Sequence, residues 1–94
     1  MKRTIVIDAS TFENKYYAHK TMKEAFADYE YYGSNLDALH DVLTSVGEEL
    51  SVEFRHYEIA REKLGVYAES IIRVFEAATA ENDRLEAEFY EDAE

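Results

Sequence analysis

The sequence predicts a small α/β domain with a parallel β-sheet, and two observations lead to this fold class. Segments with the composition of strands alternate along the chain with segments whose apolar residues recur at helical spacing. The 94 residues, 47% of them hydrophobic, suffice for one modest core but not for two. We therefore expect one domain over residues 1–94, with right-handed crossovers between strands and an acidic end, residues 91–94, that frays.

The first third of the chain reads as a strand followed by a helix and a loop. Residues 3–7 form a nearly continuous apolar run with β-branched side chains, which is typical of a strand covered on both faces. The helix that follows should be capped near Ser10 or Asn14, and residues 28–33 should form a loop. Apolar residues at helical spacing mark the inner face of this helix: Phe12, Ala18, Met22, Ala25 and Phe26.

The second half of the chain predicts two further strands and two further helices. Residues 50–55 and 84–90 each alternate apolar and polar side chains, as a half-buried strand does. A short helix over residues 56–64 should end at Gly65, where glycine tolerates the left-handed conformation. The last helix should cover residues 66–80, with an inner stripe made by Ala68, Ile71, Ile72, Phe75 and Thr79.

A helix in the middle of the chain has the most informative sequence, Tyr-Tyr-Gly-Ser-Asn-Leu-Asp-Ala-Leu-His-Asp over residues 31–41. With Ser34 as N-cap, the first turn reads as a variant of the capping box that ends at Asp37. The buried stripe is expected to contain Leu36, Leu39, Leu43 and Val46. The opposite side then carries Asp37, His40, Asp41 and Thr44.

Asp37 and Asp41 are four residues apart on this helix, so their like charges repel by about 0.2–0.5 kcal/mol. Asp37 can serve as a cap, as a binding residue or as both, since it meets the positive end of the helix dipole. Asp41 lies one turn deeper, where neither capping nor the dipole accounts for it. A solvated surface acid is the simple explanation, and a basic binding partner is the other.

Charge and cysteine content narrow the class of protein. The 21 acidic and 10 basic residues give a net charge of −11, which repels nucleic acids and anionic membranes and attracts basic partners, although acidity can also serve solubility alone. The absence of cysteine suits a reducing compartment. The first apolar run is too short for a signal peptide or a membrane span, so we expect a cytoplasmic protein.

The central motif, Tyr31-Tyr32-Gly33-x-Asn35-Leu36-Asp37-Ala38-Leu39-x-Asp41, resembles the signature of the barstar family of ribonuclease inhibitors. The resemblance extends to residues 2–7, 53–55, 68–70 and 74–75, nearly end to end. It implies a three-stranded parallel sheet packed with about four helices. It also implies no enzymatic activity, no cofactor and no metal, and a monomer that binds a small basic secreted ribonuclease one to one.

The resemblance further implies that the second helix and the loop before it block the active site of the nuclease. Asp41 would replace an RNA phosphate against arginine and histidine side chains, and Asp37 would pair with a neighbouring basic residue. Tyr31 would pack on the catalytic histidine of the nuclease, while one of Tyr31 and Tyr32 should face the core. Close contacts would come from Gly33, Asn35, Leu36, His40 and Val74.

Three positions depart from the family pattern. His40 stands where the family has a tryptophan, and the loop of residues 45–47 is one residue shorter and lacks another. The family pattern has an acid on the last helix at the position that Ala77 occupies in this chain. The neighbouring Glu76 lies about 100° around the helix. The carboxylate pair is retained while the rim differs, so the inhibitor class is better supported than the identity of the target.

Other functions remain open from the sequence. Asp37, His40 and Asp41 share a helix face and could seat a metal ion, although surface histidines without such a role are more common. We find no glycine-rich phosphate loop, nucleophile motif or zinc-hydrolase motif. The main alternative is an acidic module that neutralises another basic nuclease toxin, as an immunity protein does, or a nucleic-acid-binding protein.

Overall fold

Three parallel strands, in the order β1-β2-β3, form a sheet that makes up one layer of the fold. The computed structural model describes residues 2–29 and 35–91. Val52 in the central strand lies between Ile5 and Ala87 of its neighbours, which fixes the register of the sheet. The strands are β1 (Arg3–Asp8), β2 (Leu50–Arg55) and β3 (Leu85–Phe89).

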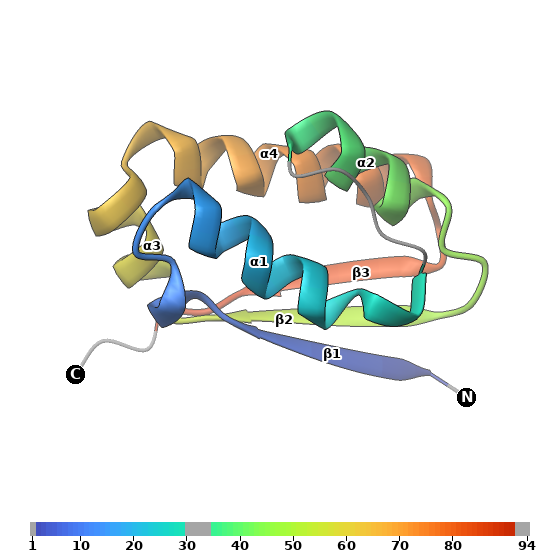
Figure 1. The fold of residues 1–94 in the computed structure, drawn as a ribbon. Helices are drawn as coiled ribbons and strands as arrows, with labels where there is room; N and C mark the ends of the chain where they lie inside the picture. Colours follow the sequence, from blue (N-terminus) through green and yellow to red (C-terminus); the bar gives the residue numbers. More distant parts are fainter. Residues whose placement is uncertain (1, 30–34, 92–94) are drawn as a thin grey trace.

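The α-helices cover one side of this sheet, so the described chain forms two layers (Figure 1). They are α1 (Lys15–Ala25), α2 (Leu36–Thr44), α3 (Tyr57–Leu64) and α4 (Val66–Glu81). A short 3-10 turn, η1 (Ala9–Thr11), lies between β1 and α1, and a second, η2 (Ala27–Tyr29), follows α1. The predicted class, an α/β domain with a three-stranded parallel sheet and four helices, is confirmed. None of the helices in the described residues is both long and apolar enough to span a membrane.

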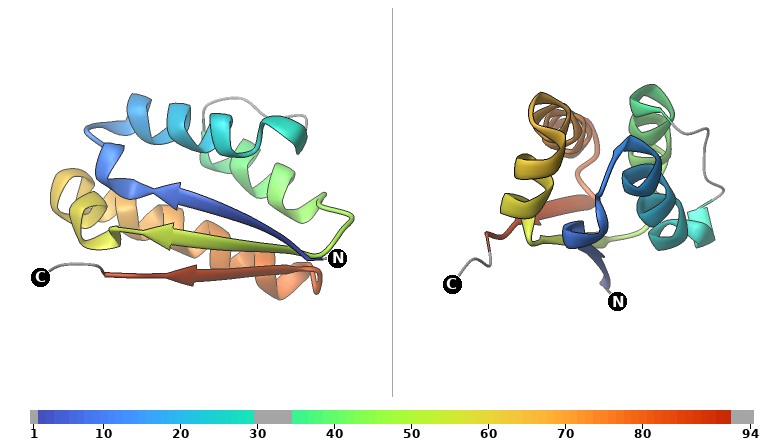
Figure 2. Two further views of the ribbon diagram at one scale, coloured as in Figure 1. Left: turned by 90° about the horizontal axis from the view of Figure 1, so that it is seen from below. Right: turned by 60° about the vertical axis from the view of Figure 1, so that its left-hand side comes forward.

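The expectation that residues 3–7 form a strand covered on both faces is wrong. Ile5 and Ile7 point into the core, whereas Val6 between them is 58% exposed. Seen from below, the strands lie in front of the helices and no helix covers them (Figure 2). Side chains along β1 therefore point alternately to the buried face and to the solvent-exposed face of the sheet, as in a strand with one solvated side.

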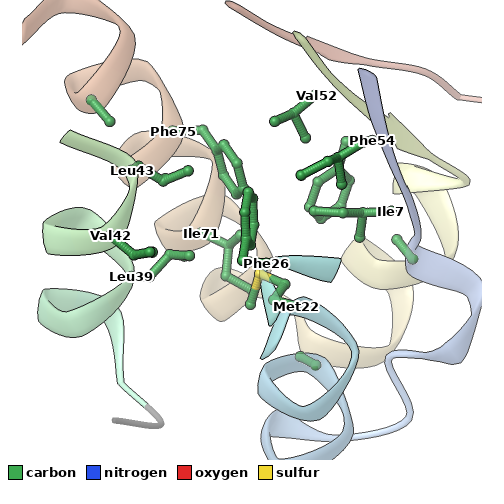
Figure 3. Packing of buried hydrophobic residues seen from close by; sticks show 14 of the residues in the cluster. Ile7, Met22, Phe26, Leu39, Val42, Leu43, Val52, Phe54, Ile71 and Phe75 are labelled. Atoms are coloured by element: carbon green, nitrogen blue, oxygen red, sulfur yellow. The ribbon is translucent and has the colours of Figure 1, made fainter. Parts of the chain in front are cut away.

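Aromatic side chains fill the space between sheet and helices (Figure 3). Phe54 of the sheet meets Phe75 of α4 edge to face, with ring centroids 5.8 Å apart. Phe12 and Phe89 pack on the same Phe54 ring at 5.5 Å and 5.3 Å. Such pairs contribute about 0.5–1.5 kcal/mol each beyond the burial of their area. The core is therefore specified by ring geometry as well as by hydrophobicity.

Most element boundaries agree with the sequence, with two corrections. The cap of α1 is Asn14, one of the two predicted capping residues, and its side chain accepts a hydrogen bond from the backbone of Tyr17. α3 begins at Tyr57 and not at the predicted residue 56, because His56 has a φ of 58° and so adopts neither strand nor helix geometry. The inner stripe of α4 is completed by Ala78, which is fully buried, rather than by Thr79, which is half-buried.

Candidate functional site

The N-cap residue of α2 fixes where the helix begins. Asn35 Oδ1 accepts a hydrogen bond from Ala38 N at 2.8 Å, so Asn35 is the N-cap. The prediction of Ser34 as N-cap, with a capping box ending at Asp37, is therefore wrong by one residue. Asn35 and Ser34 are both residue types that favour the N-cap position, so capping preference alone did not distinguish them. Asp37 remains in that first turn, where its charge meets the helix dipole.

The inner face of α2 packs against α4. Leu39 and Leu43 are completely buried, and Val42 is 5% exposed, so the inner stripe is wider than the predicted one. Figure 3 shows these three side chains directed toward α4 and the central aromatic rings. Leu36, predicted as part of the stripe, is only half-buried. This leaves its apolar surface near the start of the helix available for contact.

Asp37 and Asp41 are both exposed on the outward face of α2, as predicted. Neither carboxylate makes a hydrogen bond or an ion pair with any residue in the described ranges 2–29 and 35–91. Among the described residues, the two negative charges therefore lie one turn apart without an ion-pair partner, on a helix whose other face is buried. This arrangement can accept charge-assisted hydrogen bonds from arginine, lysine or protonated histidine of another molecule.

His40, between the two aspartates in the sequence, turns toward the last helix. Its Nε2 atom lies 2.6 Å from Oε2 of Glu81, at the C-terminal end of α4. The contact is an ion pair when the imidazole is protonated. No three metal-ligating side chains come together anywhere in the described part of the chain. His40 is thus oriented by Glu81, and the structure does not assemble Asp37, His40 and Asp41 into a metal site.

Glu81 is a member of this site that the sequence did not reveal. Val74, Ala77 and Glu81 are spaced by three and four residues, which places them in one row along α4. Glu81 lies one turn beyond Ala77, the position where the family acid is missing, and its side chain reaches α2 through His40. Glu76 is exposed beside Ala77, and Val74 is half-buried against the core. Helical spacing from Val74 and Ala77 is the sequence signal that places Glu81 on this face of α4, whereas its contact with His40 depends on how α2 packs against α4.

The segment before α2 is anchored at its start. Arg3 Nη2 contacts Asp28 Oδ2 at 2.5 Å, and the Tyr29 hydroxyl donates to Glu48 Oε1 at 2.5 Å. The Arg3 guanidinium also lies 5.2 Å from the centre of the Tyr29 ring. Residues 28 and 29 are therefore tied to β1 and to the loop that follows α2. The predicted contact residues Tyr31 and Gly33, and Tyr32 beside them, lie outside the described residues.

Comparison with known proteins agrees with this arrangement. The family model described as "Barstar (barnase inhibitor)" matches residues 2–92. A protein of Bacillus subtilis (strain 168) named "Putative ribonuclease inhibitor YrdF" is 38% identical over 80 residues, which cover 84% of this chain and 88% of that protein. The family match spans the three strands and the four α-helices of the described residues. The chain belongs to the barstar family.

Proposed function

We propose that this protein inhibits a small basic secreted ribonuclease by blocking its active site, with Asp37 and Asp41 in the positions that RNA phosphates occupy. The observation that carries the proposal is the pair of exposed carboxylates on α2, which have no partner within the described residues. Membership of the barstar family, and the name of the Bacillus subtilis relative, support the same class of target.

The chemistry follows from what a ribonuclease must bind. Its cleft holds arginine, lysine and histidine side chains because its substrate is a polyanion, so a fixed anion is a ready ligand. The carboxylates of α2 stand on a helix whose other face is buried, which lowers the conformational entropy lost on binding. The net charge of −11 then accelerates the encounter with a basic partner.

His40 and Glu81 would form the neighbouring part of the contact surface. Glu81 brings a third carboxylate toward the outward side of α2, and it is held by His40 at 2.6 Å. This acid offsets the loss of the family acid at Ala77. Because a histidine replaces the tryptophan of the family pattern, we expect the target surface opposite His40 to differ from that of barnase. We therefore propose a related nuclease toxin as the natural target.

The proposal is tested by titrating a small guanyl-specific microbial ribonuclease with this protein and measuring the rate of RNA cleavage. We expect stoichiometric inhibition by the parent protein and much weaker inhibition by Asp41→Ala. Loss of one partner of a buried ion pair costs about 3–5 kcal/mol, which corresponds to a loss of affinity of about 150- to 4,000-fold.

Glu62→Gln is the control, because Glu62 is an exposed acid of α3 whose side chain makes no hydrogen bond or ion pair within the described residues. This variant removes one negative charge at a distance from α2, so its inhibition should equal that of the parent. Similar weakening by both variants would show that total charge alone governs binding. Inhibition that is unchanged in Asp41→Ala would refute the phosphate-mimic mechanism.

A further inference from the structure

A pocket between α1 and the first turn of α4 has a composition that contrasts with the rest of the molecule. Its volume is about 320 Å³, and it is lined by Lys15, Tyr16, His19, Lys20, Lys23 and Tyr67. None of these six residues is acidic, although the whole chain has 21 acids against 10 bases. The pocket therefore concentrates positive charge on a protein that is otherwise strongly negative.

The three lysines of this pocket lack carboxylate partners in the part of the chain that the structure describes. Five other cations are paired: Lys2 with Glu86, Arg3 with Asp28, Arg55 with Glu53, Arg61 with Glu91 and Lys63 with Glu13. Lys15 and Lys20 instead lie over aromatic rings, at 4.6 Å and 6.0 Å from the centroids of Tyr67 and Tyr17. Three ammonium groups therefore line one pocket, and no carboxylate of the described residues neutralises them.

Aromatic groups form the inner wall of the same pocket. His19 is only 4% exposed, and its Nε2 atom shares a hydrogen bond of 2.5 Å with the Tyr67 hydroxyl. Burial lowers the pKa of His19 and raises the pKa of Tyr67, so both side chains are uncharged at neutral pH. Tyr16 is 68% exposed at the rim, where its ring is accessible to solvent. Tyr16 therefore offers an accessible aromatic ring next to the ammonium groups, and the uncharged pair of His19 and Tyr67 lines the pocket beside it.

We propose that this pocket binds a small ligand that carries a phosphate group and a planar ring, of the size of a nucleoside monophosphate. Lysine ammonium groups bind phosphate as mobile point charges, and the exposed ring of Tyr16 can stack on a nucleobase. The volume lies at the lower end of the range for small-molecule sites. The site is built from α1 and α4 and contains no residue of α2.

Adenosine 5′-monophosphate is a suitable probe, with binding followed by NMR shifts of the backbone amides of α1 and Tyr67. We expect saturable shifts with a dissociation constant of about 1 mM or tighter. The double variant Lys20→Gln/Lys23→Gln should weaken binding by at least about tenfold, because it removes two charge-assisted contacts from exposed positions. Circular dichroism then verifies that the variant is folded.

Arg73→Gln/Arg84→Gln is the control, since both arginines are exposed, lie outside the pocket and have no carboxylate partner among the described residues. It removes the same charge and should leave the affinity unchanged. Inorganic phosphate and adenosine, tested separately, should each bind more weakly than the nucleotide. Equal weakening by both double variants, equal affinity for adenosine and its monophosphate, or no saturable shift would overturn the proposal.

Discussion

Asn82 joins the C-terminal ends of two helices, and its replacement by alanine is expected to destabilise the protein. Its Nδ2 group donates to the backbone carbonyls of Leu43 and Val46 at 3.1 Å and 3.0 Å. Its Oδ1 atom accepts from Arg84 N at 3.1 Å, at the turn that leads into β3. One side chain therefore satisfies carbonyls at the end of α2 and also shapes the exit from α4.

The expected magnitude follows from these three contacts. Each net hydrogen bond contributes about 0.5–1.5 kcal/mol, so Asn82→Ala should lower the free energy of unfolding by about 1.5–4.5 kcal/mol. Asn82→Asp retains the acceptor for Arg84 but loses both donors, and it places a negative charge beside carbonyl oxygens at helix C-termini. We expect Asn82→Asp to be at least as unstable as Asn82→Ala.

Urea denaturation followed by circular dichroism measures both variants. Asp83→Ala is the control, because Asp83 is exposed and its side chain makes no hydrogen bond or ion pair within the described residues, so its effect should stay within about 0.5 kcal/mol. A loss in Asn82→Ala that does not exceed that of the control would refute the view that Asn82 secures α2 against α4.

Three further predictions concern the cap, the pH dependence and the association rate. Asn35→Ala removes the N-cap contact to Ala38 and should lower the free energy of unfolding by about 1 kcal/mol in urea denaturation; no loss would exclude Asn35 as the cap. Burial lowers the pKa of His19, so the unfolded chain takes up a proton first as pH falls below about 6.5. Stability should then decline with a slope of up to about 1.4 kcal/mol per pH unit, and His19→Gln should flatten the profile between pH 6.5 and the lowered pKa; an identical slope would contradict this. Stopped-flow association with a basic ribonuclease should slow steeply between low salt and about 0.15 M salt; a rate independent of salt would argue against electrostatic steering.

The sequence predicted an element correctly where a regular repeat of apolar side chains identifies it. The alternation of Leu50, Val52 and Phe54 identified β2 correctly because a strand with one buried face repeats every two residues. The apolar run of β1 led to the wrong prediction of a strand covered on both faces, because a short run does not reveal whether a second layer covers its other face. Val6 is exposed there despite being apolar. The shift of the α2 cap from Ser34 to Asn35 has a similar origin, because adjacent residues had comparable capping preference.

The candidate site was predictable only in the part that is contiguous in sequence. Asp37 and Asp41 lie on one helix, so helical spacing was enough to place them on a common exposed face. The contact between His40 and Glu81 joins residues 41 positions apart, and it depends on how α2 packs against α4. The pocket of α1 was hidden for the same reason, since His19 meets Tyr67 across 48 positions. Such contacts come from tertiary packing, which local patterns do not encode.

The most direct test of the central claim is the dependence of inhibition on substrate concentration. If the carboxylates of α2 occupy phosphate positions in the cleft, inhibitor and RNA exclude one another. The apparent inhibition constant for a guanylyl dinucleotide substrate should then rise linearly with substrate concentration while kcat stays constant. An inhibition constant independent of substrate, with a reduced kcat, would contradict the account.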